Sequence, residues 1–254
     1  MTSFSARSFR LWQRNRDVFF RVWWTELPGA VAEPLFVLLA MGFGLGGFVG
    51  NINGQRYIEF IAPGIISSYV MFSAVFECTY GSFVRMQYQR TYDAIIATPL
   101  TVDDVIAGEM FWGATRAVMT SAIILLVLAA FQLVSSPWAL LIPVLAALEG
   151  LMFASIAMFY TSLVKLIYTF NYFFTIIITP MFYFSGVFFP ISSFPPIVQK
   201  LSWIAPLTPV TNLARGLVSG KLESGLWFSF ALAVAITVVF FWLALVKMRR
   251  RLIV

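Results

Sequence analysis

Histidine is absent from the 254-residue chain, and cysteine occurs once, at Cys78. The absence of histidine excludes catalytic mechanisms and metal sites that depend on an imidazole ring. A single cysteine excludes a disulfide within the chain and leaves its redox compartment undetermined. Charged residues make up only 11% of the chain, whereas a soluble domain carries about 25%. This shortage of charge excludes an ordinary water-soluble domain.

A nucleotide-binding phosphate loop is also missing. That motif is G-x-x-x-x-G-K followed by Ser or Thr, because backbone amides hold the phosphates and the hydroxyl binds magnesium. The most similar segment is GLVSGKL, residues 216–222, which is one residue short and has Leu222 in place of the hydroxyl. Any ATP hydrolysis linked to this protein is therefore expected on a separate chain.

Apolar runs dominate what is present, since 60% of the residues are hydrophobic and 27 are phenylalanine. A helix needs about 20 mostly apolar residues to cross a bilayer. Six segments meet or approach that length, and they are residues 34–50, 60–84, 110–134, 138–164, 166–189 and 226–246. The sequence predicts an all-α integral membrane protein whose single transmembrane domain covers residues 1–254.

Lysine and arginine in the connecting segments predict the orientation, because cytoplasmic loops are enriched in both. With a cytoplasmic N-terminus, twelve of the 17 basic residues lie inside and one, Arg116, lies within a span. The four predicted outside are Arg56, Lys200, Arg215 and Lys221. Both termini are therefore expected on the cytoplasmic side.

Residues 4–28 have the pattern of an amphipathic helix. Aromatic side chains that include Trp12 and Trp23 share one face, and arginines occupy a neighbouring face at positions Arg7, Arg10, Arg14 and Arg21. This pattern predicts a helix lying in the membrane interface, with arginines toward anionic headgroups. It acts either as a topology anchor alone or also as a brace for a cytoplasmic partner.

The segment YDAIIATPLTVDDVIAGE, residues 92–109, contains four of the eleven acidic residues. Pro99 ends a short helix that covers the first part of residues 91–101. Thr101 and Asp104 then match a capping box, which starts a new helix running into the third span. Capping explains Asp103 and Asp104 without any function, but it leaves the short helix unexplained. We call residues 91–101 the elbow.

A proline-rich segment, residues 190–224, follows the fifth predicted span. Two amphipathic pieces, near residues 195–204 and 209–218, are too short to cross a membrane. They predict a pair of external re-entrant helices, with an ordinary external loop as the alternative.

Three charged residues fall inside predicted spans, where a charge costs about 2.5–3.5 kcal/mol or more. Glu77 and Arg116 are expected at similar depth near the inner ends of two neighbouring spans, where they can pair. The alternative to pairing is that each side chain extends to the inner membrane interface. Glu149 lies near mid-membrane with no basic residue at its depth, and a structural hydrogen bond is its alternative to a functional role.

The fifth predicted span is rich in aromatic residues. If they face a cavity, five of them are candidates to stack on sugar rings or line a lipid path, namely Tyr168, Tyr172, Phe173, Phe182 and Tyr183. Lipid contact and helix packing are the simpler explanation.

The order of these features resembles the permease subunits of ATP-binding-cassette exporters of the polysaccharide and drug export class. The elbow and the segment FYFSGVFFPISSFP carry the resemblance, which is strongest to nodulation-type lipo-oligosaccharide and O-antigen exporter permeases. It implies a homodimer in the bacterial cytoplasmic membrane with two ATPase subunits, which hold the ATP and magnesium. It also implies that the elbow couples to the ATPase, through Tyr92, Asp93, Ala94, Ile95, Ile96, Thr98, Pro99 and Leu100.

The resemblance implies no cofactor on this chain and no nucleic-acid partner. Two other classes stay open at this point. A membrane transferase could use Asp103 and Asp104 to hold magnesium and a pyrophosphate, although the D-D-x-x-D spacing and a second aspartate cluster are missing. A self-contained ion-coupled transporter is the other, although no inverted repeat is visible.

Overall fold

The computed structural model describes residues 7–52, 54–222 and 224–252, which are almost entirely helical. Five helices in this part of the chain are long and apolar enough to cross a membrane. They cover Val31–Val49, Tyr57–Tyr88, Val102–Ala130, Pro137–Leu163 and Leu226–Leu252. The prediction of a helical membrane protein is confirmed at this level, and each of these helices overlaps a predicted span.

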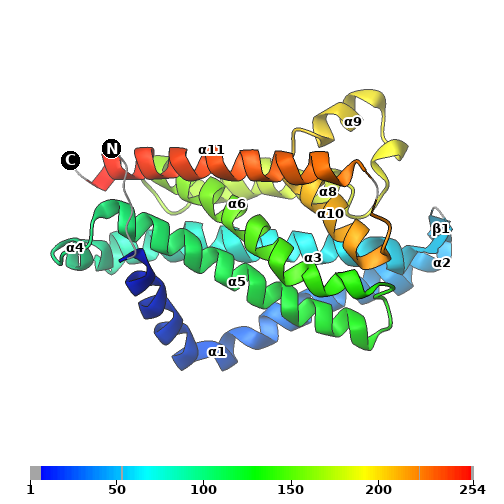
Figure 1. The fold of residues 1–254 in the computed structure, drawn as a ribbon, viewed down its shortest axis with the longest axis horizontal. Helices are drawn as coiled ribbons and strands as arrows, with labels where there is room; N and C mark the ends of the chain where they lie inside the picture. The colour runs from blue at the N-terminus through cyan, green and yellow to red at the C-terminus, as the bar shows by residue number, and fades with distance from the viewer. Residues whose placement is uncertain (1–6, 53, 223, 253–254) are drawn as a thin grey trace.

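The first helix, α1 (Ser8–Leu39), is longer than expected. It continues without a break through the π-helix η1 (Ala40–Leu45) into α2 (Gly46–Val49). The prediction of a separate helix over residues 4–28, of which 4–6 lie outside the described residues, is therefore wrong in its boundary. Pro28 and Pro34 lie inside α1, and proline inside a helix removes a hydrogen bond. The helix bends along its length (Figure 1).

A short hairpin with two residues in each strand, β1 (Asn51–Ile52) and β2 (Gln55–Arg56), leads into α3 (Tyr57–Phe76). The same helical run continues through two π-helical turns, η2 (Glu77–Gly81) and η3 (Val84–Tyr88). α3 packs against α5, α6 and α10 and is buried along most of its length. It is the central helix of the bundle.

The elbow contains the short helix α4 (Thr91–Ile96), and α5 (Val102–Ala130) follows it. The 3-10 turn η4 (Pro137–Leu141) then opens α6 (Ile142–Leu163). α5 and α6 pack closely because each presents a glycine to the other. A Cβ on Gly150 would lie 2.5 Å from the Cβ of Ala117, so only glycine allows this spacing.

The span predicted over residues 166–189 is shorter in the structure. The helical run consists of α7 (Thr169–Phe173), η5 (Phe174–Ile178) and α8 (Thr179–Phe184), and it is below the length of the other five. The chain leaves the helix at Gly186, whose φ of 78° favours glycine. The following Val187 is fully buried, and its Cα would lie 2.9 Å from a Cβ on Gly64. Packing against α3 therefore ends the helix early.

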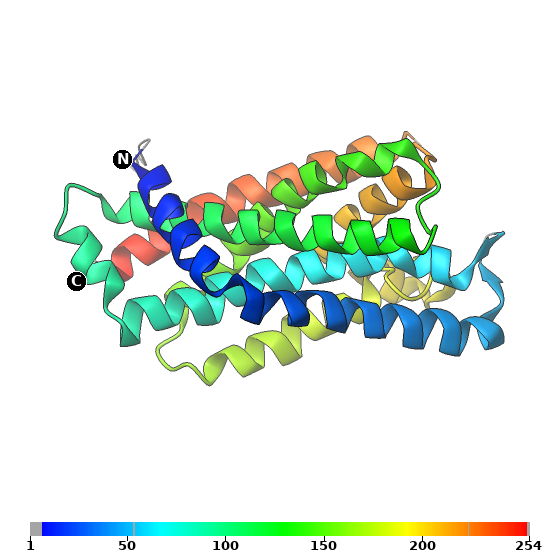
Figure 2. The same ribbon diagram turned by 90° about the horizontal axis from the view of Figure 1, so that it is seen from below.

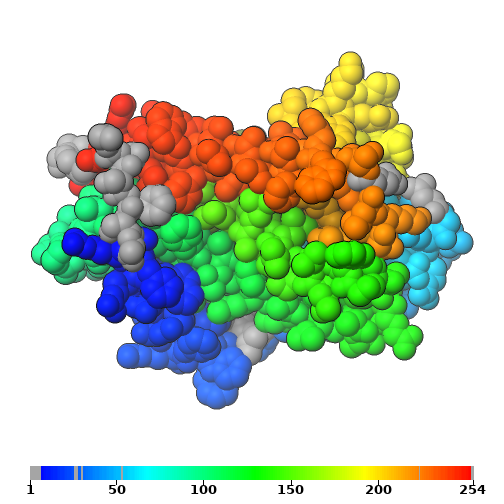
Figure 3. Space-filling model, viewed as in Figure 1, coloured from blue at the N-terminus to red at the C-terminus, as the bar shows by residue number. Residues whose placement is uncertain are grey.

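The proline-rich segment forms the 3-10 turn η6 (Ile191–Ser193) and two short helices, α9 (Pro196–Ser202) and α10 (Leu207–Ser219). The prediction of a short helical pair is confirmed, whereas its membrane depth stays a prediction. α11 (Leu226–Leu252) closes the bundle along α6 and α10. In Figure 3 the α9 segment projects from the body of the molecule.

Both ends of the described chain lie at the same end of the bundle as α4 (Figures 1 and 2). The β-hairpin and α9 lie toward the opposite end. The bundle therefore separates the elbow from the proline-rich segment, as the charge count predicts. Which end faces the cytoplasm stays a prediction.

Candidate functional site at the elbow

The elbow is built by local signals. α4 ends at Ile96, and the chain turns at Pro99 before α5 begins. The backbone N–H of Thr101 donates to the Asp104 carboxylate at 3.0 Å, and the Asp104 N–H donates to the Thr101 hydroxyl at 3.2 Å. The predicted capping box is confirmed, and it fixes the start of α5 next to the turn.

Tyr92 points into the protein, with only 1% of its surface exposed. Burial raises the pKa of Tyr92 well above its usual value, and the Glu109 carboxylate raises it further. The phenol is therefore neutral at physiological pH. The resemblance implies coupling to the ATPase through Tyr92; in the structure this side chain faces inward and anchors α4 to the bundle, so it is not part of the exposed surface of the elbow.

The outer face of the elbow consists of other residues. Ile95, Ile96 and Leu100 are half-buried. The exposed residues among those predicted to couple are Asp93, Ala94, Thr98 and Pro99. This surface is mainly small and uncharged, with a single carboxylate.

A buried charged network lies directly beneath the elbow. Arg85 donates from Nη2 to both Glu109 on α5 and Glu77 on η2, the latter at 2.8 Å. Glu109 is fully buried and also accepts from the Ser82 hydroxyl at 3.0 Å and from the Asn15 amide at 3.3 Å. The network thus connects α1, α5 and the π-helical end of α3.

The predicted pair of Glu77 and Arg116 is present, with Arg116 Nε 3.7 Å from Glu77 Oε2. It is the looser contact, because Arg85 lies closer to the same carboxylate. From the sequence, Arg85 counts only as one of the basic residues predicted inside and Glu109 only as one of the four acids of residues 92–109, so the centre of the network is not predicted. The signal that could have found them is spacing, since each lies about two helical turns from Glu77 or Arg116.

Both partners on the α3 run lie in π-helical turns, Glu77 in η2 and Arg85 in η3. Such turns are rare and are frequently found at functional sites. An inserted residue shifts every following side chain around the helix axis, so these turns decide which side chains face α5. The charged network therefore depends on a local distortion of α3.

The N-terminal part of α1 holds the elbow from outside. Arg7 donates to the carbonyl of Pro99 at 2.8 Å, and the Trp12 indole donates to the Thr115 hydroxyl at 2.8 Å. A Cβ on Gly108 would lie 2.8 Å from the Ser8 carbonyl oxygen, so α1 and α5 are in close contact there. Trp12 thus packs on α5, which the prediction of a membrane-facing aromatic stripe did not include.

The other residues of that stripe have mixed surroundings. Arg10 and Arg21 are exposed, as a membrane-surface role requires. Arg14 is half-buried and donates to the Asn15 side chain at 3.0 Å. Trp23 stacks on Trp24 with ring centroids 4.6 Å apart.

The two aspartates at the start of α5 have partners from the protein. Asp104 completes the capping box, and the Asp103 carboxylate lies 3.5 Å from Arg249 on α11. Asp103 is buried as well, with 4% exposed. These contacts leave the pair poorly placed to hold a magnesium pyrophosphate, which a membrane transferase requires.

Two adjoining pockets reach the charged network from the side of α1. One of about 420 Å³ includes Asn15 and Arg85, and the other of about 640 Å³ includes Glu33. They share four lining residues, Glu77, Tyr80, Gly81 and Arg116. The network is therefore accessible from a hollow between α1, α3 and α5, although Glu109 itself is buried.

Residues 7–219 match the ABC-2 type transporter family. The chain belongs to this family. It is similar to Nodulation protein J of Sinorhizobium fredii, with 34% identity over 96% of this chain and 93% of that protein. Nodulation protein J of Rhizobium meliloti is 35% identical over 95% of this chain and 92% of that protein. The Inner membrane transport permease YadH of Escherichia coli is 26% identical over 91% and 90%.

Membership of the ABC-2 family makes the chain a transmembrane permease, the membrane subunit of an ATP-binding-cassette transporter. The resemblance stated from the elbow and the FYFSGVFFPISSFP segment is thereby confirmed. Family membership implies an ATPase partner, and it agrees with the multi-pass helical bundle.

The aromatic residues proposed for a substrate path have mixed surroundings in this ABC-2 permease. Tyr168, Tyr172 and Tyr183 are more than half exposed on the outer surface of the short helical run. Phe173 is buried and stacks on Tyr160 with centroids 4.3 Å apart. Phe182 meets Phe72 of α3 edge to face at 5.4 Å. Phe173 and Phe182 therefore serve packing, whereas the tyrosines form an open surface.

Glu149 lies in the middle of α6 and is 1% exposed. Its Oε1 has no hydrogen-bond partner among the described residues. Glu149 is separate from the network beneath the elbow.

Proposed function

We propose that this chain is the permease of an exporter that moves an amphipathic substrate outward from the cytoplasmic side. The proposed substrate classes are a lipid-linked glycan, a lipo-oligosaccharide or a drug-like lipid. The permease acts as a homodimer with two copies of a separate ATPase, which bind ATP and magnesium. Membership of the ABC-2 family and the likeness to a transport permease support this proposal.

The elbow is the proposed docking site for the ATPase. Its exposed residues and the half-buried Ile95, Ile96 and Leu100 offer an apolar surface beside one carboxylate. Because exposed ion pairs contribute only about 0–1 kcal/mol, apolar contacts should dominate docking. Tyr92 contributes from inside, by holding α4 in place.

One observation carries the proposed coupling, namely the buried contact of Arg85 with Glu77 and Glu109. A force on α4 reaches α5 through the capped turn at Thr101, and it reaches the α3 run through Arg85. Asn15 extends the same path to α1. The three helices that surround the inner hollow therefore move together when the elbow is pushed.

The exposed tyrosines of α7 and α8 are the proposed surface for the substrate path or the second permease copy. Aromatic rings favour stacking on sugars and on other rings. The termini are proposed to lie in the cytoplasm of a bacterium, with the permease in its inner membrane. The surface of α1 around Arg10 and Arg21 then contacts anionic lipids.

Placing an arginine on the elbow tests the docking role. Ala94 is exposed on α4, so Ala94→Arg should leave the fold intact and prevent apolar contact with the ATPase. Copurification with the ATPase and substrate-stimulated ATP hydrolysis in vesicles should both fall about tenfold or more. A tenfold fall corresponds to a loss of about 1.4 kcal/mol of binding free energy at the docking surface. Ser192→Arg, at an exposed position in the proline-rich segment, is the matched control. Normal copurification and hydrolysis for Ala94→Arg would show that the elbow is only a connection.

A further inference from the structure

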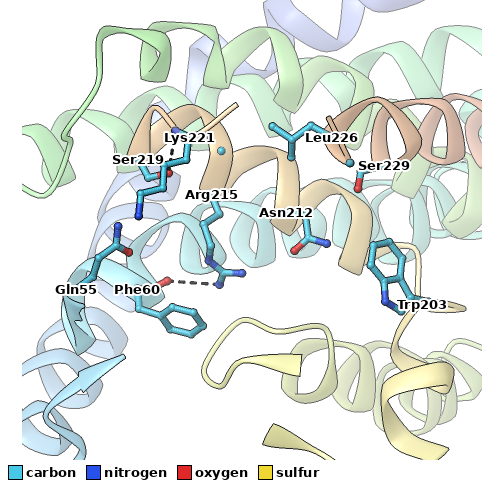
Figure 4. Close-up of a pocket in the computed structure, with 11 residues that line it drawn as sticks. Gln55, Phe60, Trp203, Asn212, Arg215, Ser219, Lys221, Leu226 and Ser229 are labelled. Carbon is cyan, nitrogen blue, oxygen red and sulfur yellow. Dashed lines mark hydrogen bonds between the residues drawn. The ribbon is translucent and has the colours of Figure 1, made fainter. Parts of the chain in front are cut away.

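A pocket of about 470 Å³, drawn in Figure 4, is lined by elements at the end of the bundle opposite α4 (Figure 1). It is enclosed by β2, the start of α3, α10 and the start of α11. Asn212, Arg215 and Ser219 line it from one face of α10, because spacings of three and four residues repeat along a helix. From the sequence, Arg215 and Lys221 count only as basic residues predicted outside the membrane.

The lining of this pocket is cationic. Arg215 and Lys221 both contribute to it, and none of its described lining residues is acidic. Neither residue forms an ion pair with an acid in the described parts of the chain. A cation that is removed from water without a counter-charge is costly. The described residues of the pocket therefore supply no negative charge to balance these two cations.

Arg215 is held rigidly within the pocket wall. Its Nη2 donates to the Gly186 carbonyl at 2.8 Å and to the Phe60 carbonyl at 3.5 Å, and the guanidinium lies 4.2 Å from the Phe60 ring. Its Nε is buried and has no hydrogen-bond partner among the residues that the structure describes. These contacts fix the cation but do not neutralise it. Burial lowers the pKa of Arg215 to about 10, so it remains protonated at neutral pH.

The side chain of Lys221, unlike that of Arg215, is not held in place by hydrogen bonds to described residues. Its side chain is exposed and forms no hydrogen bond with another described residue. In Figure 4 its ammonium group lies on the same side of α10 as the Arg215 guanidinium, next to Gln55. The two cations therefore border one space together with amide groups that can donate hydrogen bonds.

The remaining walls are apolar or aromatic. Phe60 lies beside Arg215, and Trp203 lies across the pocket from it (Figure 4). Leu226 closes the side formed by α11. Cationic and amide donors on one side and aromatic walls on the other match a molecule with an oxyanion next to an apolar part.

We propose that this pocket binds an oxyanion, a phosphate or carboxylate, of an amphipathic molecule at the end of the permease opposite the elbow. Arg215, Lys221 and Asn212 donate to the oxyanion, and its apolar part lies against Phe60 and Trp203. The site is independent of the elbow and of the proposed direction of transport.

Native mass spectrometry of the purified full-length chain tests the site, with phosphatidylglycerol as the probe. Lys221→Gln and Asn212→Ala should each weaken phosphatidylglycerol binding about tenfold, because a charge-assisted hydrogen bond is among the stronger polar contacts. Lys200→Gln is the matched control, since Lys200 is an exposed cation on α9 that does not line the pocket. These two variants avoid Arg215, whose loss would also release the turn at Gly186.

Inorganic phosphate, compared with chloride at equal ionic strength, separates the two sources of the oxyanion. If phosphate displaces the lipid and Lys221→Gln weakens phosphatidylglycerol binding, the site accepts a free oxyanion. If Lys221→Gln weakens phosphatidylglycerol binding but phosphate does not displace the lipid, the site requires the lipid headgroup. Equal losses in Lys221→Gln and Lys200→Gln, or no loss in either pocket variant, would overturn the proposal.

Discussion

Arg85 and Glu109 form an ion pair between the π-helical end of the α3 run and α5, and the Glu109 side chain is fully buried. The same guanidinium also binds Glu77. One cation therefore balances two carboxylates at the base of the elbow, with Arg116 as a more distant second cation.

Replacing Arg85 with leucine should leave two carboxylates poorly compensated. Removing one partner of a buried pair costs about 3–5 kcal/mol, so Arg85→Leu should lower the melting temperature in detergent clearly. The exposed pair Arg56–Glu59 provides the control, where Arg56→Leu should cost about 0–1 kcal/mol. Equal losses in the two variants would show that burial does not strengthen the Arg85 contacts.

Glu77 should interact more strongly with Arg85 than with Arg116, because the distances are 2.8 Å and 3.7 Å. Glu77→Gln and Arg116→Leu should each lower the transport rate, and their double variant should lose less than the sum. The cycle of Glu77→Gln with Arg85→Leu should give the larger coupling energy. Strictly additive effects in both cycles would mean that Glu77 contacts neither arginine in the working transporter.

Tyr92 should act through folding, not through docking. Removing a buried aromatic ring costs about 3–5 kcal/mol, so Tyr92→Ala should lower the melting temperature and loosen α4. Tyr92→Phe keeps the ring and should copurify normally with the ATPase. Weak copurification of Tyr92→Phe at an unchanged melting temperature would place the hydroxyl in the docking surface after all.

Gly108 should tolerate no larger side chain. A Cβ there would lie 2.8 Å from the Ser8 carbonyl and 2.9 Å from Leu11 Cβ, so Gly108→Ala should separate α1 from α5. Overpacking of this kind costs about 1–3 kcal/mol, which thermal melting can measure. Gly44→Ala is the control, because a Cβ on Gly44 meets nothing within 4 Å. A stable Gly108→Ala variant would show that α1 is not firmly seated.

Cysteine labelling should establish the topology. In a Cys78→Ala background, a membrane-impermeant thiol reagent should label Lys200→Cys from outside and Asp93→Cys only after the membrane is opened. Both positions are exposed and lie on segments toward opposite ends of the bundle. Labelling of Lys200→Cys from the cytoplasmic side alone would reverse the predicted orientation.

Local features of this protein could be read from the sequence. Long apolar runs predict five of the helices, because a helix in lipid must satisfy its hydrogen bonds within its own segment. Pro99 and the Thr101–Asp104 capping box predict the elbow because each signal acts over only three or four residues of the chain. The two short helices of the proline-rich segment also follow from local spacing and length.

Contacts between helices were decided only by the tertiary structure. The inward side chain of Tyr92 and the Arg85–Glu109 pair depend on how α3 and α5 are rotated, and the π-helical turns change that rotation. The early end of the fifth helical run has a similar origin, because Val187 packs on Gly64 and Arg215 binds the Gly186 carbonyl. Apolar periodicity does not encode these contacts, since a membrane helix is apolar on nearly every face and only packing selects the face that turns inward.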